Sequence, residues 1–140
     1  MTEIRTFHPD DTEAVIALWH DAGLLRPWND PRRDILRKGT VQPELFLVAV
    51  EAAQIVGAGM AGFDGHRGTV NYLAVAARLR GTGLGRRLMA EFEARLEALG
   101  CPKVNLLVRG DNTAVLEFYR GLGYVVDDAV SLGKRLIADD

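Results

Sequence analysis

The sequence predicts an α+β domain in which helices pack on a mixed, mostly antiparallel sheet. Short apolar runs typical of strands alternate with longer segments that have a helical period. Three strand-like runs follow one another between residues 45 and 75, which indicates an antiparallel meander. The next strand is reached through a helical crossover, so it should lie parallel to the strand before it. The 140 residues are the size of one domain, and we expect a single domain over residues 1–140.

The N-terminal third is predicted to form one strand and two helices. Residues 4–7 are typical of a short strand, and residues 9–23 have a proline and acids at their start and a glycine at their end, as a helix should. The Asp-Pro pair at residues 30–31 is a cap-and-start signal for a second, shorter helix. Its period places Ile35 and Leu36 on the buried side.

The middle of the chain is predicted to hold the meander and a long helix. Its strands are expected at residues 45–50, 55–61 and 70–75, and a polar tip at residues 64–68 joins the last two. Residues 86–99 then form an amphipathic helix. The apolar face of that helix is expected to hold Leu88, Phe92, Leu96 and Leu99.

The C-terminal part is predicted to complete the sheet. Residues 104–108 form the strand parallel to the end of the meander, and Asp111 or Asn112 caps a further helix. Two closing strands are expected, at residues 124–126 and residues 130–132.

Composition excludes several classes of protein. Hydrophobic residues make up 48% and charged residues 26%, as in globular domains. A formal net charge of −2 does not favour nucleic-acid binding. The single cysteine, Cys101, allows neither an internal disulfide nor a zinc site, and no metal is expected. No segment has the pattern of a signal peptide or a membrane span, so we expect a cytoplasmic protein without membrane partners.

The most informative segment is the glycine-rich turn between the meander and the long helix. Gly81, Gly83 and Gly85 alternate with other residues just before the helix, so backbone N–H groups can approach an anion closely. Arginines at positions 78, 80, 86 and 87 add positive charge. The spacing is not that of a Rossmann fingerprint, and the turn has Gly-Arg-Arg at residues 85–87 where a Walker loop needs Gly-Lys followed by Ser or Thr. The turn therefore predicts a site for a different phosphate-containing ligand.

Two motifs resemble the GNAT superfamily of N-acetyltransferases. Residues 80–85, Arg-Gly-Thr-Gly-Leu-Gly, are similar to its Q/R-x-x-G-x-G/A signature. Residues 112–124 are similar to its N-x-x-A-x-x-F-Y-x-x-x-G-F/Y segment. Residues 25–31 and 64–68 further resemble a group of small bacterial acetyltransferases within the superfamily.

The resemblance implies a three-layer α/β/α fold in which two parallel strands splay apart at the acetyl-CoA site. It implies an acetyl-CoA-dependent N-acetyltransferase that acts on a primary amine of a small molecule or peptide by direct attack on the thioester. Its pantetheine contacts would be Leu73, Val75 and Asn112, while Tyr119 would protonate the departing thiolate. The expected pyrophosphate contacts are Arg80, Gly81, Thr82, Gly83, Leu84, Gly85 and Arg86. Asn112 is equally well explained as a helix cap.

The sequence does not assign a general base. The family positions for a base match Thr69 and Asn71, and neither side chain is a useful base. Glu44, Asp64 and His66 are candidates elsewhere, and a water chain is an alternative to all three.

The acceptor side is assigned to a loop, a strand residue and the polar tip. Trp28 either stacks on the substrate or holds its loop against the core, two interpretations that the sequence weighs equally. Asp30 and Asp64 would suit a cationic amine, and His66 and Tyr72 complete the expected substrate contacts. Arg26 and Arg67 would instead suit a carboxylate on the acceptor, and the sequence does not choose between these options.

Two alternative functions remain beside the leading one. The missing base is compatible with a non-catalytic acyl-CoA-binding regulatory module. Within the enzyme class, protein N-terminal or lysine acetylation competes with small-molecule acetylation. The closing strands near residues 131–133 offer a homodimer contact, although no residue requires one.

Overall fold

The computed structural model describes residues 1–139, and it alternates strands and helices as expected. Its principal elements are β1 (Thr2–Thr6), α1 (Thr12–Asp21), α2 (Pro31–Lys38), β2 (Phe46–Glu51), β3 (Gln54–Phe63), β4 (Gly68–Val75), α3 (Leu84–Ala98), β5 (Val104–Asn105) and α4 (Thr113–Gly121). Short 3₁₀ turns precede α1, β2 and α3 at Pro9–Asp11, Pro43–Leu45 and Ala77–Leu79. The expected helix start at Pro9 is therefore a 3₁₀ turn, and His8 caps it.

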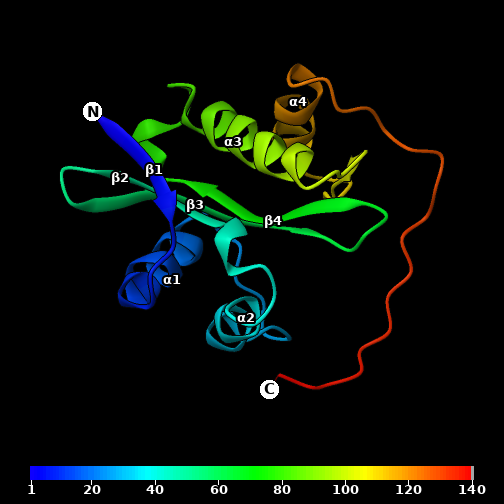
Figure 1. Cartoon of the computed structure of the whole chain (residues 1–140), viewed down its shortest axis with the longest axis horizontal. Helices are drawn as coiled ribbons and strands as arrows, with labels where there is room; N and C mark the ends of the chain where they lie inside the picture. The colour runs from blue at the N-terminus through cyan, green and yellow to red at the C-terminus, as the bar shows by residue number, and fades with distance from the viewer. Residues whose placement is uncertain (140) are drawn as a thin grey trace.

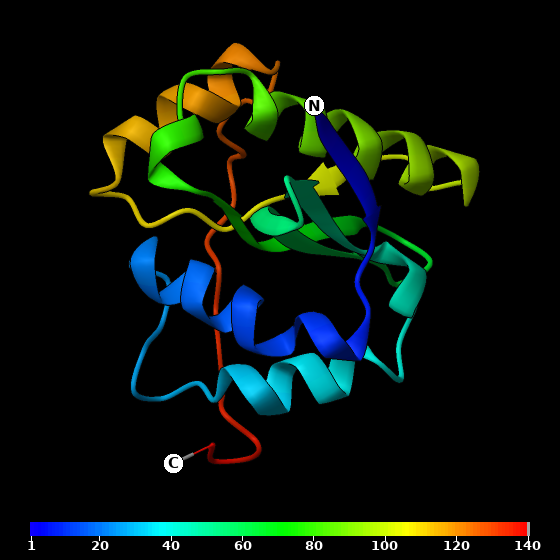
Figure 2. The same cartoon turned by 90° about the vertical axis from the view of Figure 1, so that its left-hand side faces the viewer.

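The five strands form one sheet in the order β1-β2-β3-β4-β5. All neighbouring strands are antiparallel except β4 and β5, which are parallel. Helix α1 lies against one face with α2 beneath it, and α3 and α4 cover the other face (Figures 1 and 2). The α+β, three-layer fold with a mixed and mostly antiparallel sheet is confirmed.

Two apolar clusters hold these layers together, one on each face of the sheet. On the α1 side, Trp19 is completely buried and its ring lies parallel to Phe46. On the α3 side, Leu88 and Phe92 are completely buried against the strands. Because burial of one large apolar side chain contributes roughly 1.5–3 kcal/mol, each of these buried side chains stabilises the packing of the helices on the sheet.

A bulge in β4 reverses the faces of its side chains. Ala74 pairs with Ala58 and Asn71 pairs with Met60, so two residues of β4 lie opposite one of β3. Tyr72 stands in this bulge with φ +58°, which is rare for a residue with a side chain. Val70 contacts the α3-side cluster, whereas Tyr72 contacts the α1-side cluster. The bulge therefore turns the Tyr72 ring towards α1 and α2.

The parallel strands β4 and β5 pair over two residues only. Gly68 pairs with Val104 and Thr69 with Asn105, and no further ladder joins the two strands within residues 1–139. The strand expected at residues 104–108 is thus shorter than predicted. Beyond these pairs the chains separate, and the edge of β4 from Val70 to Val75 has no partner strand in the described part of the chain. This separation is the splay that the resemblance implied.

The two closing strands were predicted wrongly. Residues 124–126 and 130–132 form no ladder, and the chain after α4 runs apart from the sheet to return beside α2 (Figure 1). Asp127 holds this segment to β5 through the side chains of Lys103 and Asn105, at 3.0 and 2.6 Å. Because the contact uses side chains in place of backbone groups, no strand pairing propagates from it. Exposed apolar side chains in the segment are Val125, Val126, Val130, Leu132, Leu136 and Ile137.

Two residues assigned to buried helix faces are exposed. Leu36 on α2 has an exposed fraction of 71%, and Leu99 has one of 47% because it lies one residue beyond the end of α3. Met89 and Leu84 of α3 are buried in the core in addition to the predicted residues. Among residues 1–139, no helix has both the length and the apolar character required to cross a membrane.

Candidate active site

The candidate site is the opening between β4 and β5. Here the edge of β4 offers the backbone groups of Leu73 and Val75, and each residue also packs a side chain on the α3-side cluster. One of these groups is already in use, because the Val75 carbonyl accepts a hydrogen bond from Arg80 Nε at 3.3 Å. An unpartnered strand edge can bind an extended molecule as an additional strand does.

The glycine-rich turn delivers free backbone N–H groups to the same end of β4. Gly81 has φ +80° and Gly83 has φ +91°, and a side chain is strained in that conformation. A Cβ atom on either glycine would meet no atom within 4 Å, so both face open space. No side chain caps α3, and the amides of residues 83–86 donate to no backbone carbonyl within residues 1–139. The start of α3 is thus equipped to bind an anion.

The arginines near this turn are not equivalent. Arg78 forms an ion pair with Glu51 at 2.9 Å, so the positive charge expected from this arginine is compensated. Arg80, Arg86 and Arg87 contact backbone carbonyl groups only, and none has an acidic partner among residues 1–139. Their positive charge is therefore available for a ligand.

Gly85 has a second role besides leaving room for an anion. A Cβ atom at this position would lie 3.1 Å from the Phe118 ring. The absence of a side chain therefore lets α4 approach the start of α3. This contact places the Phe118 turn of α4 beside the start of α3.

Asn112 caps the start of α4, and Tyr119 lies within this helix. The Asn112 side chain accepts a hydrogen bond from the Val115 amide at 3.3 Å, so its expected role as a helix cap is confirmed. The Tyr119 ring lies edge-to-face against Phe118 and Tyr124, and burial raises the pKa of its phenol to about 12. The Tyr119 hydroxyl forms no hydrogen bond with another side chain or carbonyl of residues 1–139, whereas the Tyr124 hydroxyl donates to Glu93 at 2.5 Å.

Tyr119 also lines a large groove on the outer side of β5. The groove has a volume of about 1470 Å³ and lies between β5, α4 and residues 124–131. Its far end reaches the tip of the β3–β4 hairpin, where His66 lines it. Tyr119 and His66 therefore border the same groove, Tyr119 from α4 and His66 from the β3–β4 hairpin.

The hairpin tip is placed away from the opening. Asp64 accepts hydrogen bonds from the amides of His66 and Arg67, both at 2.8 Å, and these bonds lower the pKa of its carboxyl. The tip adjoins Gly68, where β4 and β5 are still paired. The structure therefore does not bring Asp64 and His66 to the end of β4 where Tyr72 lies.

Asp30 and Tyr72 lie at α2. Asp30 caps this helix by accepting from the Arg32 and Arg33 amides at 2.9 and 3.3 Å, as its cap signal predicts. Tyr72 stacks on Trp19 with ring centroids 4.1 Å apart. Its hydroxyl donates to Asp34 Oδ2 at 2.5 Å, and burial followed by this hydrogen bond raises the pKa of the phenol.

Asp34 is a site residue that the sequence did not reveal. It accepts from Tyr72 with one oxygen and from Arg37 at 3.1 Å with the other. Its spacing of four residues from Asp30 places both on neighbouring turns of α2, which is a visible but unspecific signal. Only the bulge that turns Tyr72 towards α2 distinguishes Asp34 from any other surface acid.

Trp28 lies on the surface of the α1–α2 loop with an exposed fraction of 49%. The guanidinium carbon of Arg109, which follows β5, is 5.8 Å from the centre of its ring. This cation–π contact joins the loop to the far side of the opening. The alternative that Trp28 holds its loop against the core is wrong.

Comparisons with known proteins agree with this geometry. The model of the acetyltransferase (GNAT) family matches residues 8–124. An acetyltransferase of Sodalis glossinidius is 54% identical over 138 residues, which cover 98% of this chain and 97% of the relative. This chain belongs to the GNAT family. The resemblance to this superfamily, and to bacterial acetyltransferases within it, is therefore confirmed, and with it the assignment to the acyltransferases.

Solved structures of GNAT proteins share the fold. Ard1 from Thermoplasma volcanium has a TM-score of 0.78 at 28% identity, with 90% of this chain and 84% of that chain covered. The protein AAC(6')-Iy, solved in complex with a CoA-based bisubstrate analogue, has a TM-score of 0.77 at 15% identity, with 98% of this chain and 99% of that chain covered. At that identity the second likeness shows the fold alone.

Proposed function

We propose that this GNAT protein is an acetyl-CoA-dependent N-acetyltransferase that acetylates a primary amine, and that residues 1–140 act as one domain. The observation that carries the proposal is the opening between β4 and β5 with the uncapped start of α3 at the same end. One feature offers backbone pairing to an extended arm, and the other offers N–H groups to a pyrophosphate. Acetyl-CoA contains both an extended arm and a pyrophosphate.

The residues present suit this co-substrate. Amides of the glycine-rich turn would bind the pyrophosphate together with the uncompensated charges of Arg80 and Arg86. Leu73 and Val75 would pair with the pantetheine arm, and the Asn112 amide group remains able to donate to it while its oxygen caps α4.

In the proposed reaction the neutral amine nitrogen attacks the thioester carbonyl carbon and forms the new C–N bond. The C–S bond breaks, and its electron pair stays on sulfur. Tyr119 then supplies a proton to the thiolate, while the nitrogen releases its surplus proton to solvent. Because burial raises the Tyr119 pKa to about 12, this phenol holds its proton across the neutral range and recovers it readily from water.

The experiment combines binding with turnover. Acetyl-CoA should raise the Tm of the purified protein, since a ligand that binds only the folded state stabilises it. Tyr119→Phe should slow amine-dependent CoA release about a hundredfold, a typical contribution of general acid catalysis, and leave the acetyl-CoA shift in Tm unchanged.

Tyr124→Phe is the matched control because it removes a neighbouring hydroxyl that is bonded to Glu93. Turnover should persist in this variant. Full turnover in Tyr119→Phe would remove that residue from the mechanism. A protein that binds acetyl-CoA but releases no CoA with any amine would instead be the acyl-CoA-binding regulatory module.

A further inference from the structure

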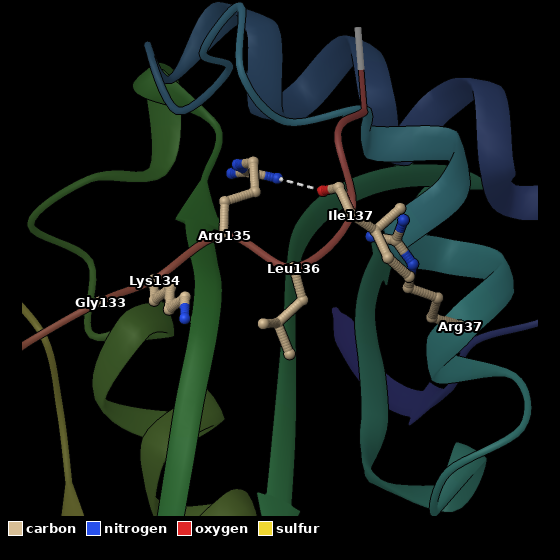
Figure 3. Close-up of a pocket in the computed structure, with 6 residues that line it drawn as sticks. All are labelled: Arg37, Gly133, Lys134, Arg135, Leu136 and Ile137. Atoms are coloured by element: carbon tan, nitrogen blue, oxygen red, sulfur yellow. Dashed lines mark hydrogen bonds between the residues drawn. The ribbon is translucent and has the colours of Figure 1, made fainter.

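A cavity of about 590 Å³ lies between α2 and the C-terminal segment (Figure 3). Arg37 reaches it from α2, and the remaining lining comes from residues 133–137. Three of the lining side chains are cations, namely Arg37, Lys134 and Arg135, and no lining residue is acidic. In a chain with a net charge of −2, this is a local concentration of positive charge.

The three cations differ in how far they are neutralised. Arg37 binds both Asp139 and Asp34, at 2.5 and 3.1 Å, so its charge is compensated. Arg135 donates to two neutral groups, Asn29 Oδ1 at 2.9 Å and the Ile137 carbonyl at 3.2 Å. Lys134 has no ion pair or hydrogen bond with the rest of residues 1–139. Two positive charges are thus left for an anion.

The segment that supplies these charges is fixed in place at its end. The Asp139 side chain has an exposed fraction of 1% and contacts Arg37 as well as Arg33 at 3.7 Å. It also accepts from the Asp30 amide at 3.4 Å. The two arginine partners hold the pKa of Asp139 at about 2, so this attachment is charged at neutral pH. The cavity wall is therefore anchored to α2 and to the loop before it.

The cavity is connected to the acceptor side of the opening. Arg37 shares Asp34 with Tyr72, and Tyr72 stands in the β4 bulge beside Leu73. Arg135 reaches the α1–α2 loop at Asn29, next to Trp28. Two hydrogen bonds thus separate the cationic cavity from the strand that the thioester is proposed to lie along.

We propose that this cavity is a carboxylate subsite and that the acceptor is a small amine that also carries a carboxylate, as an amino acid does. Arg135, whose side chain extends towards the α1–α2 loop, binds the carboxylate, and Lys134 adds positive charge from the other side of the segment (Figure 3). The amine lies on the side of Tyr72 and Asp34. Uncompensated cations on the cavity, close to the strand edge proposed to hold the thioester, match an acceptor with a carboxylate at one end and an amine at the other. A volume of about 590 Å³ suits a small molecule better than a protein chain. This inference rests on the proposed acetyltransferase function.

The test compares the standard amino acids with their carboxamides, which keep the amine and the side chain but lose the negative charge. The ratio of kcat/KM for an amino acid to kcat/KM for its amide measures the preference of each protein for the carboxylate. In the double variant Lys134→Gln, Arg135→Gln this preference should fall about tenfold or more, since charge-assisted hydrogen bonds to the carboxylate are lost. The shift in Tm on adding acetyl-CoA should not change.

The matched control is Arg32→Gln with Arg95→Gln, which removes two positive charges from exposed or partly exposed ion pairs outside the cavity. Its acid-to-amide preference should equal that of the wild type. Comparing the acid-to-amide preference of each variant with that of the wild type cancels the effect of the different amine pKa values of amino acids and their amides.

Two results overturn the subsite: an unchanged preference in the cavity variant, and turnover of other amines without turnover of any amino acid. The proposed function fails by a different result, the absence of CoA release with every amine.

Discussion

The two sides of the opening between β4 and β5 are built in different ways. On the phosphate side, consecutive residues of one turn present backbone groups, and Gly81 and Gly83 supply conformations that side chains rarely adopt. On the acceptor side, side chains from three distant segments meet, as in the contacts of Tyr72 with Asp34 and of Arg37 with Asp139. One side depends on backbone conformation, whereas the other depends on long-range side-chain contacts.

This difference determines what each side tolerates. On the phosphate side, a substitution is tolerated when its side chain points away from the ligand, but anion binding is lost when the residue cannot adopt the required φ. On the acceptor side, removal of one polar atom leaves the backbone in place, so selectivity for the acceptor is lost before the fold is. Variants of matched size on the two sides therefore separate co-substrate binding from acceptor recognition.

The largest effect is expected from Gly83→Ala in the glycine-rich turn. An alanine at φ +91° should lower the free energy of unfolding by about 1–2 kcal/mol and weaken acetyl-CoA binding about tenfold. Chemical denaturation and calorimetric titration would measure the two quantities. Gly121→Ala is the control, because that glycine has space for a Cβ atom and lies at the end of α4. Equal stability and equal acetyl-CoA affinity in the two variants would show that the phosphate side does not depend on backbone conformation.

A smaller effect is expected from Tyr72→Phe on the acceptor side. The loss of the hydrogen bond to Asp34 should cost about 1 kcal/mol of stability. The KM for the amine should rise while acetyl-CoA binding stays unchanged, as steady-state kinetics and titration would show. Tyr124→Phe removes a phenol–carboxylate bond of the same length on the other face of the sheet and should leave the amine KM unchanged. A change of acetyl-CoA affinity in Tyr72→Phe would contradict the division into two sides.

The same difference explains how much could be predicted from the sequence. Signals that are local in the chain were interpreted correctly, such as the cap of α2 at Asp30 and the glycine-rich turn before α3. The antiparallel meander also follows from local alternation, and the crossover helix fixes the parallel partner of β4. These features need only neighbouring residues, so one sequence is enough to recognise them.

The errors concern contacts between distant segments. Residues 124–132 have the alternation of strands, but Asp127 binds β5 through side chains and no ladder follows. Asp34 became a site residue only because a bulge turns Tyr72 towards it, and no local pattern announces that bulge. Asp139 likewise looks like a terminal surface acid until α2 places two arginines around it.

The smallest effect is expected from Asp139→Asn, and it depends on pH. The Asp139 pKa is lowered from 3.8 to about 2 by Arg37 and Arg33, so the carboxylate stabilises the folded state above pH 4. This contribution is lost as the pH falls from about 4 towards 2, where the carboxyl takes up a proton in the folded state as well. Asp139→Asn should therefore have a lower Tm than wild type at pH 7, and the difference should shrink below pH 4. Glu13→Gln breaks the exposed ion pair with Arg32 and should change the Tm little at pH 7. If Asp139→Asn matched Glu13→Gln at pH 7, the C-terminal segment would not be held by this carboxylate, and the acceptor side would lose the contact that fixes its outer wall.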